Sequence, residues 1–351
     1  MEIPQLNFIR FVLSFAIVIF HVGRTIYPFD QPVLKELVGS ANLGVSFFFL
    51  LSGFIMVIAY HDEDKGLIPS KEQYWVSRIA RTYPVYLFSM VLYIVSTLLT
   101  APETIRPLPV ILNVLLLQAW IPPFPLYMNG PAWALSVQFF FYLIFPFVLP
   151  LLANLQTSSL VKVVAAFWAF SLLVHVLLLA TIAPRVPSFA HDVIFYNPLM
   201  HLNSFIVGIG GALLYKRMPA EGNRYAPGSC MLLSGACLAA LVLVPNPVIR
   251  YAHNGLLAPV GLVFIFGLAR DRSGLSRLLA SKPVMLVGAL SYSIYLLHGP
   301  LRKLVMYQYI AHGVPWSSPV RFYIYLVLLA MFSLASYYLI EKPARNIIKG
   351  K

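Results

Sequence analysis

The chain has 351 residues, of which 60% are hydrophobic and only 11% are charged. Soluble globular domains contain about 45–50% apolar and roughly 25% charged residues, and the mean hydropathy of +0.80 leaves no stretch for an independent soluble domain. This composition excludes a disordered protein, a disulfide scaffold, a coiled coil and a DNA-binding domain. We therefore predict an all-α fold, a polytopic bundle of membrane-spanning helices.

The formal net charge of +13 would indicate nucleic-acid binding in a soluble protein. Here most Lys and Arg residues fall in a few loops, so we interpret the charge as a topology signal and expect no nucleic-acid partner. The two cysteines, Cys230 and Cys237, lie seven residues apart in one apolar run. That spacing predicts neither a disulfide framework nor a zinc site, and no metal is expected.

Apolar runs long enough to cross the bilayer predict about ten transmembrane helices. A shorter run of about 14 residues, 108–121, is closed by Pro122, Pro123 and Pro125. Its length is typical of a re-entrant or interfacial segment, and we do not count it as a span. In chain order the ten predicted spans are 6–27, 41–60, 84–101, 131–152, 160–182, 196–215, 229–245, 249–269, 284–308 and 319–341.

The distribution of basic residues sets the expected orientation. Ten spans place the basic segments 65–81, 216–224, 270–282 and 342–351 on the same side, whereas an additional crossing at 108–121 would separate them. The positive-inside rule then makes that side cytoplasmic, together with both termini. We expect residues 1–351 to form a single transmembrane domain with no separate soluble domain.

All twelve acidic residues lie in loops or at the ends of predicted spans. Ion- or proton-driven carriers usually keep a carboxylate at membrane depth, so this distribution disfavours a carrier without excluding one. The ionisable residues at membrane depth are instead Arg10, His21, His175, His201 and His298. No polar stripe surrounds His175 or His201, and we interpret these two as helix-packing residues.

The first predicted span carries the clearest polar pattern, with Asn7, Arg10, Ser14, His21 and Thr25 at helical spacing. These side chains share one stripe, which must face the bundle interior or a wet cavity. The alternative is a seam that joins helices through hydrogen bonds. Because an arginine and a histidine share the stripe, we favour a functional site.

His21 lies 15 residues into its span, about 22 Å from the cytoplasmic edge at a rise of 1.5 Å per residue. That depth is in the outer half of the bilayer core. His298 lies at a similar depth in the predicted span 284–308, so the two histidines can share one cavity.

Arg78 and Arg81 lie three residues apart, just before a predicted span. On a short interfacial helix their guanidinium groups would face one side, which suits phosphate binding. A membrane anchor that touches lipid headgroups is an equally good interpretation of this pair.

The fourth predicted span begins near Trp133 and carries Ser136 and Gln138. Trp133 also fits the aromatic belt found at membrane interfaces. The Gln138 amide can hydrogen-bond an imidazole or a hydroxyl, but it cannot exchange a proton at neutral pH. We expect Gln138 at a depth comparable to that of His21.

Six stretches together resemble the acyltransferase-3 family of bacterial inner-membrane acyltransferases, and the resemblance covers essentially the whole chain. Each stretch alone is weak evidence, but six in order with sensible spacing are specific. They run from Leu6 through Arg10 to His21, from Phe47 to Phe54, from Arg78 to Pro84, from Trp133 to Pro146, from Ser291 to His298 and from Tyr337 to Pro343.

The resemblance implies an enzyme that takes an acyl group, usually acetyl, from cytoplasmic acyl-CoA and delivers it to a hydroxyl of an envelope or exported carbohydrate. It implies that His21 is the essential histidine and Arg10 its partner, and that Arg78 and Arg81 bind acyl-CoA. The family commonly has Glu where this chain has Gln138, which puts an acid–base role at that position in doubt.

The matching stretches also contain residues that we expect to bind or orient the substrate. Some family members carry a soluble, hydrolase-like C-terminal domain, whereas this sequence ends ten residues after Glu341. We therefore expect the membrane domain to act alone or with a separate partner. The expected substrate-binding or orienting residues are Trp133, Ser136, Gln138, Tyr292 and His298.

We expect an O-acetyltransferase of the bacterial inner membrane that uses acetyl-CoA as its donor substrate and holds no bound cofactor. The acceptor would be an exopolysaccharide, a lipopolysaccharide or a lipid-linked sugar, and the polysaccharide-synthesis machinery is an expected partner in the lipid bilayer. The chemistry needs a base near the hydroxyl, which suits histidine, and groups that stabilise an oxyanion. Two alternatives stay open: a carrier or flippase for a lipid-linked or small polar substrate, and an inactive assembly partner.

Overall fold

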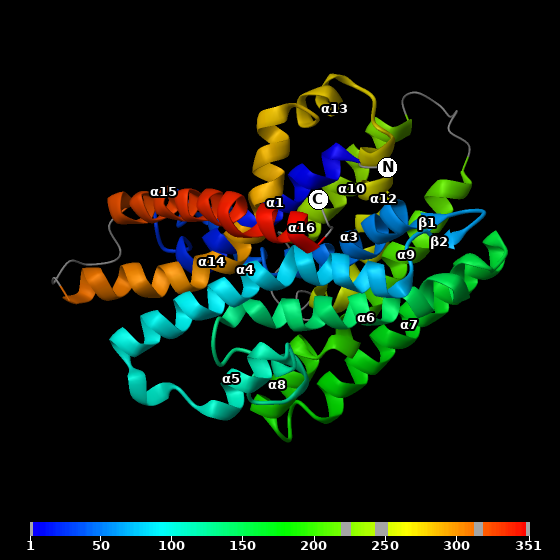
Figure 1. The fold of residues 1–351 in the computed structure, drawn as a ribbon. Helices are drawn as coiled ribbons and strands as arrows, with labels where there is room; N and C mark the ends of the chain where they lie inside the picture. Colours follow the sequence, from blue (N-terminus) through cyan, green and yellow to red (C-terminus); the bar gives the residue numbers. More distant parts are fainter. Residues whose placement is uncertain (1–2, 219–225, 243–251, 312–318, 349–351) are drawn as a thin grey trace.

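The computed structural model shows a bundle of helices (Figure 1). Within the described part of the chain the only strands are β1 (His61–Asp62) and β2 (Gly66–Leu67), which form a small antiparallel hairpin. The predicted all-α polytopic membrane fold is confirmed. The structure describes residues 3–218, 226–242, 252–311 and 319–348.

Eight helical segments of the described residues are long and apolar enough to cross a membrane, and each matches one of the ten predicted spans. Short helices extend some of them: η3 (Gly130–Ala132) precedes α6, η4 (Pro198–His201) precedes α9, and η6 (Tyr337–Glu341) joins α15 to α16 (Lys342–Ile348). The eight are α1 (Pro4–Val22), α3 (Leu43–Tyr60), α4 (Lys71–Thr100), α6 (Trp133–Ala153), α7 (Thr157–Thr181), α9 (Leu202–Arg217), α14 (Lys282–Ala311) and α15 (Pro319–Ser336).

The other two predicted spans, 229–245 and 249–269, correspond to α10 (Ala226–Val242) and α12 (Ala258–Arg270). These helices are shorter than the eight segments, and they pack against each other. Residues 243–251, at the boundary between the two predictions, lie outside the described residues. The count of ten crossings therefore stays a prediction.

The run 108–121 does not form a spanning helix, as predicted. Its helix, α5 (Pro107–Val114), has eight residues. Leu116 then takes a left-handed conformation with φ of 57°, which interrupts the helical pattern before η2 (Gln118–Trp120). The remaining short helices connect the spans and are α2 (Pro32–Gly39), η1 (Pro102–Thr104), α8 (Pro187–Tyr196), η5 (Ala252–Leu256) and α13 (Gly274–Leu279).

The first helix is shorter than predicted. α1 ends at Val22, and the N–H of Gly23 closes its last turn on the carbonyl of Ile19. Thr25 therefore lies beyond the helix and outside the predicted polar stripe, whereas the other four stripe residues lie within α1.

The fourth helix, α4, is longer than predicted. It begins with a capping box formed by Ser70 and Gln73, a strong helix start. Arg78 and Arg81 consequently lie in the first turns of a 30-residue helix, and the expected short interfacial helix is wrong. The helix continues through Pro84 because packed neighbours tolerate the loss of one backbone donor in a membrane bundle.

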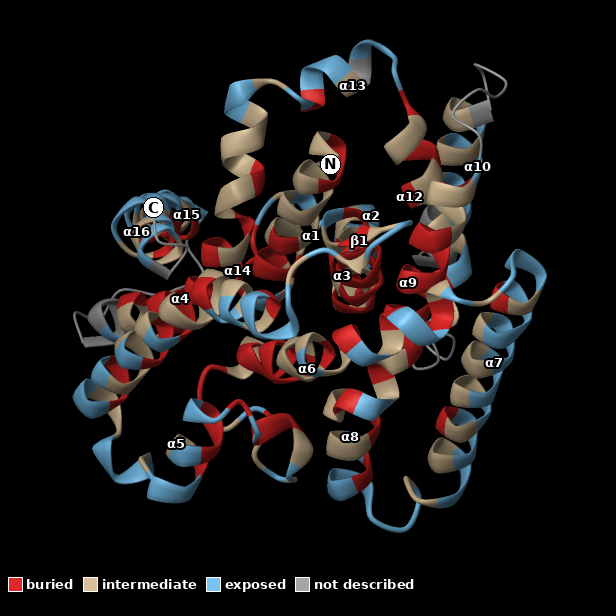
Figure 2. Cartoon of the chain, turned by 45° about the vertical axis from the view of Figure 1, so that its right-hand side comes forward, coloured by how far each residue is buried: buried red, intermediate tan, exposed pale blue. Residues whose placement is uncertain are grey.

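Helices α3 and α9 form the centre of the bundle, and Figure 2 shows α3 as almost continuously buried. Gly53 and Gly208 lie where these helices cross, and a Cβ on either would overlap the backbone of the other helix, at Phe205 and Leu50 respectively. The two glycines thus let the backbones touch, as small residues do between membrane helices. Phe141 of α6 stacks on Phe205 at 4.5 Å between ring centroids and joins α6 to this core.

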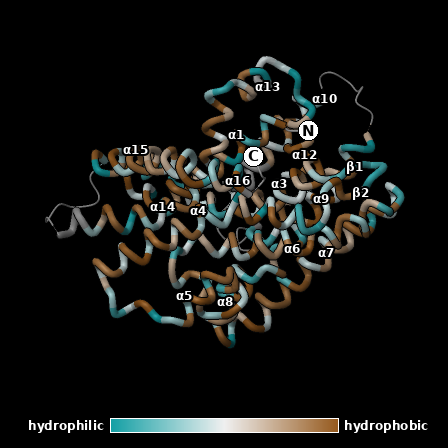
Figure 3. Tube along the Cα trace, in the orientation of Figure 1, coloured by the Kyte–Doolittle hydropathy of each residue, from teal (hydrophilic) through white to brown (hydrophobic). Residues whose placement is uncertain are grey.

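The periphery of the bundle is apolar. Phe170 and Leu173 on α7, and Val327 and Met331 on α15, have exposed side chains, which would contact lipid tails in a bilayer. Hydrophilic residues gather instead around β1 and α13 (Figure 3). The molecule therefore has an apolar surface that suits contact with lipid and a polar region around β1 and α13.

The basic segments meet at the end of the bundle that holds the start of α1, which we call the basic end. This agrees with the expectation that they share one side, although residues 219–225 and 349–351 lie outside the described residues. Which side of the membrane the basic end faces stays a prediction. The joining hydrogen bonds run from Gln5 to the carbonyl of Asp271 (3.3 Å), Lys216 to that of His61 (2.5 Å), Arg217 to that of Ala153 (2.7 Å) and Arg270 to that of Met218 (3.3 Å).

We predict that a reporter fused after Arg277 has a cytoplasmic location and that one inserted in 122–130 is periplasmic, because basic loops are retained inside. Paired alkaline phosphatase and green fluorescent protein fusions measure both locations. A cytoplasmic signal from 122–130 would mean that 108–121 crosses the membrane, and the ten-span arrangement would fail.

Candidate active site

Two cavities lie between α1, α3, α4, α6 and α14, and α8 and η5 also line the larger one. The larger, with a volume of about 760 Å³, is lined by His21 and His298, and we call it the histidine cavity. The smaller, about 130 Å³, is lined by Arg10 and Arg81, and we call it the arginine cavity. The arginine cavity lies toward the basic end, and the histidine cavity lies toward the opposite end.

The two cavities adjoin each other. Val45 of α3 and Tyr295 of α14 line both of them. On α1, Ser14 lines the arginine cavity, while Ile17, almost one turn later, lines the histidine cavity. Val45 and Tyr295 therefore form a partition between two cavities that approach each other from opposite ends of the bundle.

The polar stripe on α1 serves both cavities. Arg10 and His21 lie eleven residues apart, about 16 Å at a rise of 1.5 Å per residue, and each lines a different cavity. The family resemblance implied that Arg10 is the partner of His21, and the structure shows that the two side chains are not in direct contact. Arg10 instead shares the arginine cavity with Arg81.

The immediate partner of His21 is His298. The Nδ1 atom of His21 lies 3.0 Å from Nε2 of His298, and the ring planes are 13° apart. The Nδ1 atom of His298 lies 2.6 Å from the backbone carbonyl of Tyr295. A carbonyl can only accept, so Nδ1 of His298 carries the hydrogen and donates it.

This contact fixes the tautomers of both neutral rings. Because Nδ1 of His298 is protonated, its Nε2 is an acceptor, and Nδ1–H of His21 donates to it. The remaining nitrogen of His21, Nε2, keeps an unshared electron pair. His21 is exposed to the histidine cavity, so the arrangement supplies an oriented general base to that space.

The two arginines that were predicted to act together, Arg78 and Arg81, have different surroundings in the structure. Arg81 lines the arginine cavity, but Arg78 does not. The guanidinium of Arg78 donates to the hydroxyl of Tyr60 and lies 4.6 Å from the Tyr60 ring and 5.6 Å from the Tyr142 ring. Arg78 therefore packs among aromatic side chains, and the cavity presents Arg81 together with Arg10.

The structure does not bring Gln138 to His21. Its Nε2 donates to Oγ of Ser52 at 2.7 Å, and it lines the arginine cavity. Tyr292 lines the same cavity and donates its hydroxyl hydrogen to the carbonyl of Thr82 at 2.6 Å. Of the two partners that the sequence allowed for this amide, an imidazole or a hydroxyl, the structure shows a hydroxyl.

Trp133 lines the histidine cavity and is buried, which separates it from the exposed aromatic belt. Its ring centroid lies 5.1 Å from that of Tyr196. Ser136 lines neither cavity, because its hydroxyl donates to the carbonyl of Leu116 at 2.5 Å and secures the left-handed turn there. Trp133 can therefore contact a substrate, and Ser136 has a structural contact.

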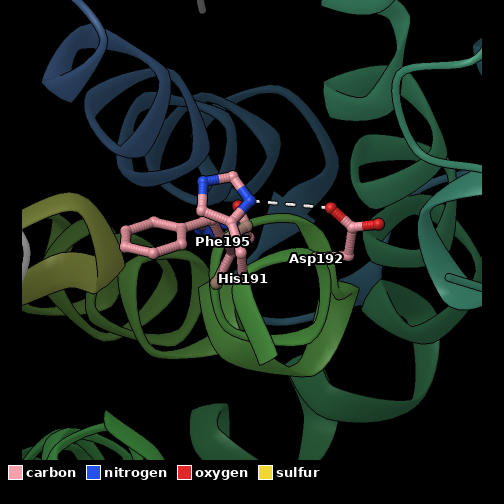
Figure 4. A network of polar contacts seen from close by, with 4 residues as sticks. His191, Asp192 and Phe195 are labelled. Atoms are coloured by element: carbon pink, nitrogen blue, oxygen red, sulfur yellow. Dashed lines mark hydrogen bonds and ion pairs between the residues drawn. The ribbon is translucent and has the colours of Figure 1, made fainter. Parts of the chain in front are cut away.

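Sequence reasoning missed several residues of the histidine cavity. Asn129 lies in a loop, and its amide donates to the carbonyl of Leu296 at 2.9 Å. His191 lies on α8, with Nδ1 3.5 Å from Asp192 and its ring near Phe195 (Figure 4). No helical stripe marks these positions in the sequence, so only the fold reveals them. The other missed residues that line this cavity include Tyr196, His253, Arg302 and Lys303.

The surroundings of His175 and His201 agree with the interpretation of both as helix-packing residues. His201 is fully buried, and its Nε2 lies 2.9 Å from the carbonyl of Phe195. His175 is also buried, against the same phenylalanine. Within the described ranges, no three His, Cys, Asp or Glu residues are grouped so that they could hold a metal ion.

The acyltransferase domain family matches residues 3–338 of the chain. The chain belongs to the acyltransferase-3 family. No solved structure is detectably similar to the chain.

Curated relatives carry acyltransferase names. Acyltransferase MdmB of Streptomyces mycarofaciens is 28% identical over 313 residues, which cover 85% of this chain and 78% of the relative. A protein of Staphylococcus aureus strain COL, named as a candidate O-acetyltransferase, is 23% identical over 368 residues. The O-acetyltransferase OatA of Staphylococcus aureus strain NCTC 8325 is 23% identical over 376 residues. The matches to the two staphylococcal proteins cover 98% of this chain but only 57% of those relatives.

We predict that His298→Ala lowers kcat for acyl transfer about ten- to hundredfold, the range for lost orienting partners of a site residue. The KM for acyl-CoA should stay unchanged, because His298 does not line the arginine cavity. His298→Gln should retain more activity than His298→Ala, because the amide oxygen can accept from Nδ1–H of His21. Steady-state kinetics in membrane vesicles measure kcat and the KM for acyl-CoA of both variants. Equal kcat losses in both variants would contradict an orienting hydrogen bond.

Proposed function

We propose that the protein is a membrane O-acetyltransferase that moves an acetyl group from cytoplasmic acetyl-CoA to a hydroxyl of an exported or envelope carbohydrate. The observation that carries this proposal is the pair of adjoining cavities, one lined by arginines and one by an oriented histidine base. The names of the relatives support O-acetyl transfer. The proposed location is the bacterial inner membrane, with both termini in the cytoplasm and polysaccharide-synthesis machinery as a partner.

The arginine cavity suits the donor. Arg10 and Arg81 line it, and their guanidinium groups can form charge-assisted hydrogen bonds with phosphates. A volume of about 130 Å³ accepts a thin thioester arm but not a nucleotide. The nucleotide of acetyl-CoA would therefore stay at the basic end, while the acetyl group reaches the partition formed by Val45 and Tyr295.

The histidine cavity suits a sugar acceptor. Its volume lies in the range of small-molecule sites. Trp133 and Tyr196 offer aromatic surface for a sugar ring, and Asn129 offers an amide. Such a combination of flat apolar surface and few polar groups fixes both position and orientation.

The proposed reaction balances with these residues. The acceptor hydroxyl gives its proton to Nε2 of His21 while its oxygen attacks the thioester carbonyl, and a new C–O bond forms. The C–S bond then breaks, and the departing thiolate takes the proton from the imidazolium. His298 accepts from Nδ1–H of His21 throughout and so stabilises the positive ring.

The alternatives make different demands on the molecule. A carrier would favour a carboxylate at the centre of the membrane, whereas the buried acidic residues Asp271 and Glu341 lie at the basic end in the described residues. An inactive assembly partner would not need an oriented base. Consumption of acetyl-CoA separates the enzyme from a carrier, and sensitivity to His21 separates it from a scaffold.

We predict that mass spectrometry of envelope and exported glycans detects an acetylated species that disappears when the gene is deleted. His21→Ala should abolish acetylation at a normal protein level, because removal of a polar group does not hinder membrane insertion. His61→Ala, in the β1–β2 hairpin at the basic end, serves as the matched control. Wild-type acetylation in cells with His21→Ala would sink the proposed mechanism.

A second prediction compares the two arginines of α4. Arg81→Ala should raise the KM for acetyl-CoA roughly tenfold to a hundredfold, since a charge-assisted contact is worth about 1.5–3 kcal/mol. Arg81→Lys should rescue this only in part, because the bidentate fork is lost. Arg78→Ala should instead reduce the amount of folded protein, since Arg78 packs against Tyr60 and Tyr142. If Arg78→Ala folds normally and raises the KM as much as Arg81→Ala does, the assignment of Arg78 to packing and of Arg81 to donor binding is wrong.

A further inference from the structure

The histidine cavity has a one-sided charge. Arg302 and Lys303 of α14 both line it, and no aspartate or glutamate of the described residues does. Nor does any described carboxylate form an ion pair with either cation. The two side chains give this wall of the cavity a positive charge that an anionic group can balance.

Arg302 lies close to the reacting histidine. It follows His298 by four residues, one helical turn, and so shares its face of α14. It lines the same cavity as His21 and His298. The Nε atom of Arg302 is buried and has no hydrogen-bond partner among the described residues. The guanidinium therefore holds an unused donor beside the base.

The side chain of Lys303, the second cation of the cavity, is held in place by contacts with α4. Its Nζ donates to Oγ1 of Thr97 at 2.6 Å and lies 4.6 Å from the ring of Tyr93, both on α4. An ammonium group has three donors, so two stay available after the contact with Thr97. Its position is thus set by the protein while part of its hydrogen-bonding capacity stays open.

We infer that the acceptor carries a negative group, a carboxylate or a phosphate, that pairs with Arg302 and Lys303 while a neighbouring hydroxyl reaches His21. This inference rests on the proposed function and names its substrate class as an acidic or phosphorylated sugar. The ring would lie against Trp133, and the two cations would hold the acid group near the base. An amino sugar with a free ammonium group would meet two like charges and be rejected.

A different role for Arg302 gives a different kinetic result. If its guanidinium stabilised the oxyanion of the acyl-transfer step, its loss would lower kcat for every acceptor. If it binds the acid group of the acceptor, its loss raises the acceptor KM and leaves kcat little changed. The split between these two parameters therefore decides between the roles.

The first experiment identifies the acetylated glycan. Mass spectrometry and sugar composition of glycans from wild-type cells should reveal a uronic acid, another carboxylated sugar or a phosphate ester in the acetylated unit, and the mass of that unit tells a carboxylate from a phosphate. Arg302→Gln and Lys303→Gln should each reduce acetylation at least tenfold, with partial retention in Arg302→Lys. Arg185→Gln, an exposed arginine before α8 that does not line the cavity, should leave acetylation unchanged. An acetylated unit without any negative group would overturn the inference.

The second experiment does not depend on catalysis. The purified full chain in nanodiscs should gain thermal stability with glucuronate or glucose 1-phosphate but not with glucose, and Arg302→Gln should remove that gain. A gain that persists in Arg302→Gln and Lys303→Gln would contradict the inference. If the wild-type protein gains thermal stability but cells contain no acetylated glycan, the anion site would be supported and the proposed function refuted. Kinetics with the identified glycan complete the test, and a loss confined to kcat in Arg302→Gln would overturn the assignment.

Discussion

The hydrogen bond between His21 and His298 is the contact on which the rest of the site depends. His298 is buried inside the apolar bundle, where a polar ring needs a protein partner, and His21 supplies one from the edge of the cavity. The backbone carbonyl of Tyr295 sets the tautomer of His298, and His298 in turn sets that of His21. One backbone oxygen on α14 therefore determines which nitrogen of α1 can act as a base.

This contact also explains why the two cavities meet where they do. α1 packs along α14, and its polar residues pass from the arginine cavity at Arg10 and Ser14 to the histidine cavity at His21. Tyr295 lies on α14 one turn before His298 and contributes to both cavities. Its hydroxyl donates to the carbonyl of Pro131 at 2.9 Å, which ties the partition to the start of α6. The reacting centre is consequently held by three helices that lie far apart in the sequence.

Much of this arrangement could be predicted from the sequence, because hydropathy and helical periodicity are local signals. The polar stripe on α1 predicted a buried polar face, and equal depth predicted that His21 and His298 could meet. The partners of Arg78 and Gln138 could not be predicted in this way. Arg78 is enclosed by Tyr60 and Tyr142, and Gln138 bonds to Ser52, contacts that depend on how α3, α4 and α6 pack. The same limit applies to Asn129 and Arg302, which gain meaning only from the cavity that they share.

The central claim is that donor and acceptor approach the same histidine from opposite ends of the bundle. Sealed proteoliposomes test it directly, with radiolabelled acetyl-CoA outside and the acceptor glycan trapped inside. The account predicts that label appears on the trapped glycan, that His21→Ala abolishes it, and that glycan added only on the acetyl-CoA side stays unlabelled by intact vesicles. Labelling only when both substrates are on the same side would contradict the account.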